Sequence, residues 1–212
     1  MPFDVITYLP EIISVTVIAI FMSISPGADF VMVTKNSLFH DRKAGLYSAL
    51  GISLAIWMHV TYSIAGLAIV IANSPLLFSL IKYLGGAYLV YMGWKTFQSG
   101  SDIRIEQGDD KPTLSNFSAF KTGVITNALN PKTTIFFLSI FTQVITPDTP
   151  ILIQLLYGAI ISIAHLLWFS LVAICVTHPL SLTLFNRYKV TIERVIGVVL
   201  IGFGLKVAFS TF

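Results

Sequence analysis

The sequence is poor in charged residues and in cysteine. Only 11% of its 212 residues are charged, against roughly 25% in an ordinary soluble domain. Hydrophobic residues make up 55% of the chain, more apolar surface than a fold of this size can hide from water. The single cysteine, Cys175, excludes an internal disulfide and any metal site built from several cysteines. We therefore expect an integral membrane protein.

Sequence signatures of catalysis and of cofactor binding are also missing. The chain contains no H-E-x-x-H, no G-x-S-x-G and no phosphate-binding glycine loop. Asp29 is the only acid deep inside an apolar run, so a membrane enzyme with paired carboxylates would lack its second member. The net charge of +3 arises from lysines and arginines in short loops, which is a topology signal rather than a sign of nucleic-acid binding. We expect no enzyme activity, no cofactor, no metal and no nucleic-acid partner.

Six apolar segments dominate the chain. Several of them exceed the roughly 20 residues that a membrane-spanning helix needs. A polar stretch over about 98–116 divides a single transmembrane domain into two halves, residues 1–97 and 117–212. The segments cover about 9–36, 44–72, 76–97, 117–143, 150–177 and 190–211, with turns predicted at 40–43, 73–75, 147–150 and 186–187.

The basic residues set the expected orientation. Lysines and arginines flank the first, third and fifth loops, whereas the second and fourth loops have none of their own. Basic loops remain in the cytoplasm, so six spans place both termini outside. Few charges flank the first segment, and a five-span topology with a re-entrant first segment is the alternative.

The two halves resemble each other. Gly86 and Gly93 of the third segment recur 111 positions later as Gly197 and Gly204. Glycines seven residues apart share one face of a helix and let a neighbouring helix approach closely. Ile81, Leu89 and Lys95 recur in the same way as Ile192, Leu200 and Lys206. The alternative is a chance match between apolar segments, but coincident glycines and lysines favour an internal repeat.

The first and fourth segments are each interrupted by a proline. Ser25 precedes Pro26 and Asn130 precedes Pro131, which predicts an N-cap followed by the first residue of a new helix at both places. Three spans per half make the second half inverted relative to the first. We therefore predict an all-α membrane protein of six helices, built as two inverted three-helix repeats with broken first and fourth helices. Paired breaks of this kind indicate a transporter's binding site.

The breaks predict where a solute binds. If the half-helices starting at Pro26 and Pro131 meet, their positive ends suit a carboxylate. We assign the ammonium group of a zwitterion to Asp29 and its carboxylate to Lys132. The alternatives are that these two charges pair with each other, that Asp29 only stabilises its helix, or that the prolines only kink the bundle. The candidate binding residues are Pro26, Gly27, Asp29, Asn127, Asn130, Pro131 and Lys132; capping explains Asn130 equally well.

Two histidines lie at related positions in the halves. His59 and His165 sit near the middles of the second and fifth segments. Because histidine titrates near physiological pH, either one, or Asp29, is a candidate for carrying a proton in a coupled cycle. The alternative is a buried histidine bonded to a neighbouring carbonyl.

Taken in order, these motifs resemble the LysE/RhtB family of bacterial amino-acid exporters. The matching residues are 25–27 with Asp29, 44–46 leading to Gly51, 83–89 with Gly93 and Trp94, and 127–132. The family usually has a second proline where this chain has Ala28, which loosens the backbone restraint at the break. The resemblance covers nearly the whole chain. It implies a multi-pass exporter of amino acids in the bacterial inner membrane, driven by the proton motive force through alternating access.

Other functions remain open from the sequence. A passive channel or an exporter of another small solute would show the same features, and a membrane assembly or sensor subunit is a third class. The expected partners are a small zwitterionic substrate and the lipid bilayer. A homo-oligomer is compatible with the sequence, which carries no sign of one.

Overall fold

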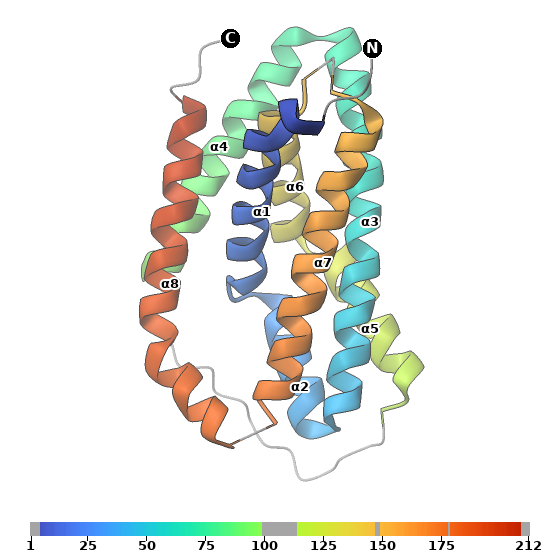
Figure 1. Cartoon of the computed structure of the whole chain (residues 1–212), viewed down its shortest axis with the longest axis vertical. Coiled ribbons are helices and arrows are strands. Elements are labelled where there is room, and N and C mark those ends of the chain that lie inside the picture. The colour runs from blue at the N-terminus through green and yellow to red at the C-terminus, as the bar shows by residue number, and fades with distance from the viewer. Residues whose placement is uncertain (1–4, 99–113, 147–148, 178, 209–212) are drawn as a thin grey trace.

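The computed structural model describes residues 5–98, 114–146, 149–177 and 179–208. These residues form a short 3-10 helix, Val5–Tyr8, and eight α-helices that run along the long axis of the molecule (Figure 1). The helices are α1 (Leu9–Ile24), α2 (Ala28–Phe39), α3 (Arg42–Asn73), α4 (Pro75–Gln98), α5 (Asn116–Ala128), α6 (Pro131–Val144), α7 (Ile151–Cys175) and α8 (Pro179–Ala208). The predicted helical class is confirmed.

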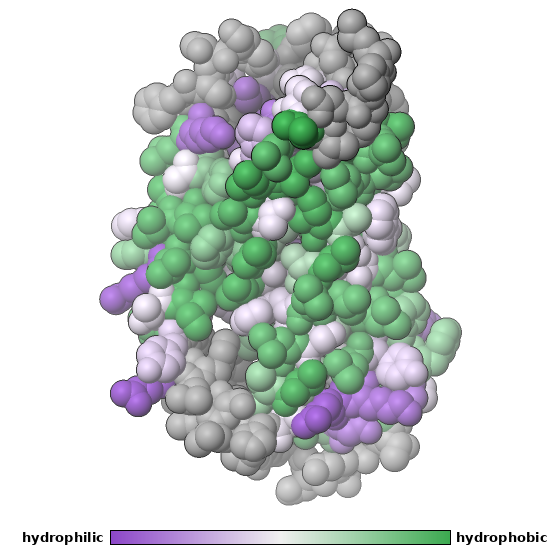
Figure 2. Space-filling model, viewed as in Figure 1, coloured by the Kyte–Doolittle hydropathy of each residue, from purple (hydrophilic) through white to green (hydrophobic). Residues whose placement is uncertain are grey.

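Three helical stretches of the described chain are long and apolar enough to cross a membrane. They are Ile6–Ile24, Arg42–Gly66 and Ile151–Cys175. The half-helices α2, α5 and α6 are only 12, 13 and 14 residues long, so none of them reaches the roughly 20 residues of a span alone. The side chains of Leu54, Ile163 and Leu167 are among many apolar ones left exposed. Figure 2 shows such side chains over most of the visible face, with polar groups nearer its two ends.

The first break lies where the sequence predicted one, but its details differ. α1 ends at Ile24, and α2 starts at Ala28 with Gly27 as its N-cap, not at Pro26. Ser25 leaves the helix because proline disfavours α-helical backbone in the residue before it. No side chain caps α2, and the Pro26 carbonyl oxygen before it accepts a hydrogen bond from Lys132 Nζ at 3.3 Å. The predicted capping role of Ser25 is therefore wrong.

The second break follows the prediction closely. α6 begins at Pro131, and the side chain of Asn130 caps it by accepting a hydrogen bond from the Lys132 N–H at 3.0 Å. Proline suits this first position because its missing N–H leaves no donor unsatisfied. The break between α5 and α6 is therefore a capped restart rather than a kink.

The last helix begins earlier than the sequence predicted. α8 starts at Pro179 and runs through residues 186–187, where the sequence predicts a turn. That turn rested on polarity alone, and residues 180–196 hold no glycine or proline to stop a helix. The predicted turns at 40–43 and 73–75 are confirmed by the ends of α2, α3 and α4. Most of the linker, residues 99–113, and residues 147–148 of the fourth loop lie outside the described residues.

Glycine contacts hold the long helices close together. A Cβ atom on Gly93 would lie 2.6 Å from the Gly197 carbonyl oxygen, and one on Gly204 would lie 2.5 Å from that of Gly86. A shift of 111 residues turns one of these α4–α8 contacts into the other. On the other side of the bundle, Gly123 of α5 rests directly on the backbone of Ser48 in α3.

Two hydrophobic clusters lie on either side of the helix breaks. The first joins α1, α6 and α7 toward the end of the molecule where α1 begins and α8 ends, through residues such as Ile18, Phe137 and Ile161 (Figure 1). The second joins α2, α3 and α7 toward the opposite end, with Phe30 and Phe169 among its members. The interruptions of the first and fourth segments therefore lie between two separate cores.

Candidate functional site

The two breaks hold each other. The Lys132 ammonium at the start of α6 donates hydrogen bonds to the Ser25 carbonyl and hydroxyl oxygens, both at 2.9 Å, and to the Pro26 carbonyl oxygen at 3.3 Å. These carbonyls follow the C-terminal end of α1, where the helix dipole is negative. A lysine from the second half of the chain thus satisfies backbone that the first break leaves unpaired, which matters where no water is at hand.

Asp29 receives hydrogen bonds from the second break in return. Its Oδ2 atom accepts from Asn127 Nδ2 at 2.9 Å and from Asn130 Nδ2 at 3.2 Å. Asp29 is 6% exposed, and its Oδ1 atom is buried without a hydrogen-bond partner among the described residues. One carboxylate oxygen is therefore held in place while the other is left to accept a further donor.

The two charges bind different groups. Asp29 bonds to amides and Lys132 to carbonyls, although the two are close enough to interact electrostatically. The alternative of a simple Asp29–Lys132 pair is therefore not the arrangement seen. Gly27 lies beside the lysine, since a Cβ atom there would be 3.4 Å from Lys132 Nζ.

The two histidines lie at different depths behind this site. His165, 3% exposed, lines the site and directs Nδ1 toward its own helix carbonyl, Ile161 O, at 2.9 Å. His59 lies behind Asn127, with Nε2 at 3.1 Å from the Asn127 carbonyl oxygen. Its Nδ1 atom contacts the Tyr62 hydroxyl, and its ring stacks on Phe137. Each histidine contacts a backbone carbonyl oxygen, as expected for a buried histidine without a proton-carrying role. His165 lines the site, whereas His59 lies behind Asn127.

A small cavity of about 10 Å³ lies at the centre of these residues. That volume holds about one water molecule, so an amino acid does not fit in this conformation. The lining residues are Met22, Ser25, Gly27, Asp29, Phe30, Asn130, Lys132, Thr133, His165 and Phe169. Any solute that reaches Asp29 must do so after the helices around the cavity have moved apart.

Sequence reasoning missed three kinds of contributor. Ser25 was assigned to capping, yet its carbonyl and hydroxyl oxygens hold Lys132. Thr133 lines the cavity, and its position one turn after Asn130 was a usable signal. Phe30 and Phe169 line the cavity from α2 and α7, but an aromatic residue in an apolar segment gives no signal that distinguishes it from core.

Comparison with known proteins agrees with the resemblance seen in the motifs. The chain matches the model of the LysE type translocator family over residues 20–211. It is 34% identical over 201 residues to the uncharacterized membrane protein YrhP of Bacillus subtilis (strain 168), covering 91% of this chain and 96% of that one. It is 32% identical over 198 residues to the leucine efflux protein of Salmonella typhimurium (strain LT2), covering 90% and 91%.

A third relative is also described as a membrane protein. The uncharacterized membrane protein YahN of Escherichia coli (strain K12) is 29% identical over 186 residues, covering 88% of this chain and 83% of its own length. No solved structure matches the chain. On the strength of the family model and of relatives that align over nearly its whole length, this chain belongs to the LysE type translocator family.

Proposed function

We propose that the protein exports small zwitterionic amino acids across the bacterial inner membrane. The observation that carries the proposal is the unpartnered Asp29 Oδ1 atom, buried in a cavity between two interrupted helices. A buried carboxylate oxygen is costly to leave without a donor, and a substrate ammonium group supplies one. The leucine efflux protein among the relatives supports an amino acid as the solute.

The carboxylate of the same solute faces the positive starts of α2 and α6. Helix N-termini bind anions through their free N–H groups and the helix dipole. Lys132 adds a positive charge, although three oxygens of the first break already accept from it. In this proposal Lys132 chiefly holds the two breaks together, and the helix ends contribute most to carboxylate binding. Pro26, Gly27, Asn127, Asn130 and Pro131 shape this site.

Six spans in two inverted repeats form the framework of the proposed cycle. The paired α4–α8 glycine contacts support this repeat, because a shift of 111 residues exchanges them. The serines of α3 and α7 support it too: Ser53 Oγ donates to Ser162 O at 3.3 Å, and Ser162 Oγ donates to Ser53 O at 2.9 Å. The two clusters flanking the cavity would then open in turn, giving alternating access.

Proton coupling is the remaining part of the proposal. Asp29 bonds to Asn127, whose carbonyl oxygen contacts His59, while His165 lines the cavity itself. Asp29 and His165 line the cavity, where either can exchange a proton with a substrate ammonium group, whereas His59 is separated from Asp29 by the Asn127 amide. The alternative function is a passive channel, which the small volume of the cavity does not favour.

Efflux from cells preloaded with labelled neutral amino acids tests the proposal. We expect the protein to accelerate loss of one or a few of them, with leucine first in the panel, and an uncoupler to abolish the acceleration. Loss that ignores the uncoupler would show a channel. An unchanged efflux rate across the panel, with the protein verified in the membrane, would refute amino-acid export.

A further inference from the structure

A second cavity opens at the end of the bundle where α1 begins. Its volume is about 210 Å³, against about 10 Å³ for the cavity at Asp29. This is below the roughly 300–1,000 Å³ of pockets for drug-sized ligands, and it suits a solute of single amino-acid size. The cavity is lined by Glu11, Ser14, Lys82, Gln143, Phe203 and Lys206, together with Pro10, Ile18 and Val144.

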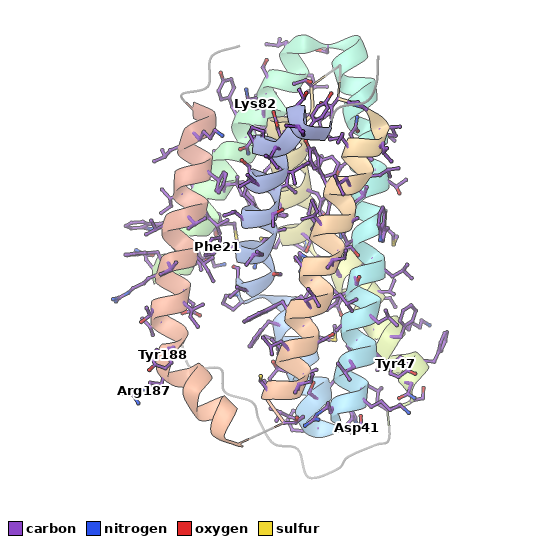
Figure 3. The ribbon with its side chains drawn as sticks, viewed as in Figure 1. Phe21, Asp41, Tyr47, Lys82, Arg187 and Tyr188 are labelled. Atoms are coloured by element: carbon purple, nitrogen blue, oxygen red, sulfur yellow. The ribbon has the colours of Figure 1, made fainter. Side chains whose placement is uncertain are left out.

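Both signs of charge line this cavity from separate helices. Glu11 comes from the first turn of α1, Lys82 from α4 and Lys206 from the last turn of α8. Figure 3 places Lys82 at the end of the bundle where α1 begins, far from Asp41 at the opposite end. An acidic group facing basic groups across a cavity complements a zwitterion, whose ammonium and carboxylate need opposite partners.

Glu11 has an atom that is available for a ligand. Its Oε2 atom is buried and has no hydrogen-bond partner among the described residues. The hydroxyl of Tyr157, a fully buried residue on α7, is in the same condition and lies close enough to Glu11 to interact with it electrostatically. Two buried polar atoms without partners in one place are costly, and a ligand ammonium group at Glu11 would remove part of that cost.

This cavity is separate from the one at Asp29. Glu11 and Ser25 lie 14 residues apart along the chain, which corresponds to roughly 21 Å of helix. Ile18 lines the outer cavity and Met22 the central one, so a single turn of α1 within the first hydrophobic cluster divides them. A solute that leaves the central cavity along α1 past this turn would enter the outer cavity next.

From this geometry we infer that the outer cavity is a second binding site for a zwitterionic amino acid, with Glu11 binding its ammonium group and Lys82 and Lys206 its carboxylate. The site receives the solute from Asp29 before release, in the direction in which the proposed topology places the outside. The inference rests on the proposed function for its substrate class. Its residues, however, are independent of the central site.

Protection of an introduced cysteine tests this site directly. Ser14→Cys in a Cys175→Ser background places one thiol on the wall of the outer cavity, where a charged, membrane-impermeant thiol reagent can modify it. We expect L-leucine, or another neutral amino acid of a panel, to slow the modification in a saturable way. Leucinamide, which lacks the carboxylate, and 4-methylpentanoate, which lacks the ammonium group, should protect less well.

Two further substitutions assign the protection to one site or the other. Glu11→Gln should raise the concentration for half-protection about tenfold or more, as expected for loss of a charged hydrogen-bond partner. Asp29→Asn should leave that concentration unchanged while efflux falls. A thiol at Thr146, which is exposed in the loop after α6 and lies outside the cavity lining, serves as the control and should not be protected.

The outcomes separate this inference from the proposed function. Absence of protection at Ser14→Cys by every member of the panel would overturn the second site, even if efflux proceeds. Protection that disappears in Asp29→Asn but survives in Glu11→Gln would overturn it as well, because the central site would then be the cause. So would equal protection at Thr146→Cys. Failure of efflux with protection intact would refute export and leave the outer site standing.

Discussion

The two helix breaks solve the same problem with different chemistry. At the first, residues 25–27 leave the helix in extended form, no side chain caps α2, and an acid follows in its first turn. At the second, Asn130 caps α6 and a lysine follows at once. Lys132 donates to the carbonyl that the first break leaves without a helix partner. In return, amide groups of the second break donate to Asp29.

This comparison shows that the two breaks complement each other although their residues differ. Each break alone would leave polar groups unpaired inside an apolar protein, which is expensive. Facing each other, they exchange donors and acceptors, and one carboxylate oxygen remains for a solute. The first break therefore supplies the oxygens of this region and the second supplies its donors. The predictions below test this division, from the largest expected effect to the smallest.

Neutralising Asp29 should have the largest effect on export. Asp29→Asn removes the only carboxylate in the cavity, and hydrogen bonds to charged groups contribute about 1.5–3 kcal/mol each. We expect efflux to fall roughly 10- to 100-fold while the protein still inserts. Asp41→Asn is the matched control, because Asp41 caps α3 through the Ala44 N–H at 2.7 Å and asparagine also caps well. Near-normal efflux by Asp29→Asn would remove Asp29 from the mechanism.

Removing the Lys132 ammonium should lower stability as well as export. In Lys132→Met the oxygens of Ser25 and Pro26 lose their donor, which we expect to cost about 1.5–3 kcal/mol. Thermal unfolding in detergent measures the loss, with the exposed Lys121→Met of α5 as the control. Unchanged stability would break the proposed mutual support of the two breaks.

The same variant tells whether Lys132 only holds the two breaks together or also binds substrate. If Lys132 also binds the substrate carboxylate, Lys132→Met should weaken handling of carboxylate-bearing substrates more than that of their amides. An equal loss of competition by L-leucine and by leucinamide would show that the lysine only holds the two breaks together. The assay is competition of each compound with labelled substrate during efflux.

Glycine substitutions compare the halves away from the breaks. Gly93→Ala and Gly204→Ala would each press a methyl group onto the backbone of the partner helix, at 2.6 and 2.5 Å from a carbonyl oxygen. We expect both to destabilise the protein by about 1–3 kcal/mol and by similar amounts. Gly202→Ala, where nothing lies within 4 Å, is the control. Strongly unequal losses at Gly93 and Gly204 would contradict a symmetric α4–α8 contact.

The serine pair should give the smallest effect. Ser53 and Ser162 bond reciprocally between α3 and α7, and hydrogen bonds between membrane helices contribute about 0.6 kcal/mol on average. We expect Ser53→Ala and Ser162→Ala to lower stability by about that much each, and the double variant by less than the sum. Additive losses would show that the two serines act independently.

Much of the fold was readable from residue type and order. The low charge and the apolar segments predicted a helical membrane protein, and the helical class and the family agree. Proline after asparagine predicted the start of α6 correctly. The same rule was wrong at Pro26, since α2 begins two residues later and the carbonyls of that break bind residue 132, more than 100 positions away. The turn predicted at 186–187 failed because polarity without glycine or proline does not stop a helix.

Composition, the spacing of apolar segments and the two prolines determined that this chain is helical and that its first and fourth apolar segments are interrupted, because helix propensity and capping act over a few residues. Only the tertiary structure decided which groups the breaks bind. Local sequence does not tell whether Lys132 reaches a carboxylate or a carbonyl, or that the Asp29 carboxylate keeps one oxygen unpaired. It likewise does not bring Glu11, Lys82 and Lys206 to one cavity. Those outcomes depend on how helices distant in the chain pack, and packing is set by the whole bundle at once.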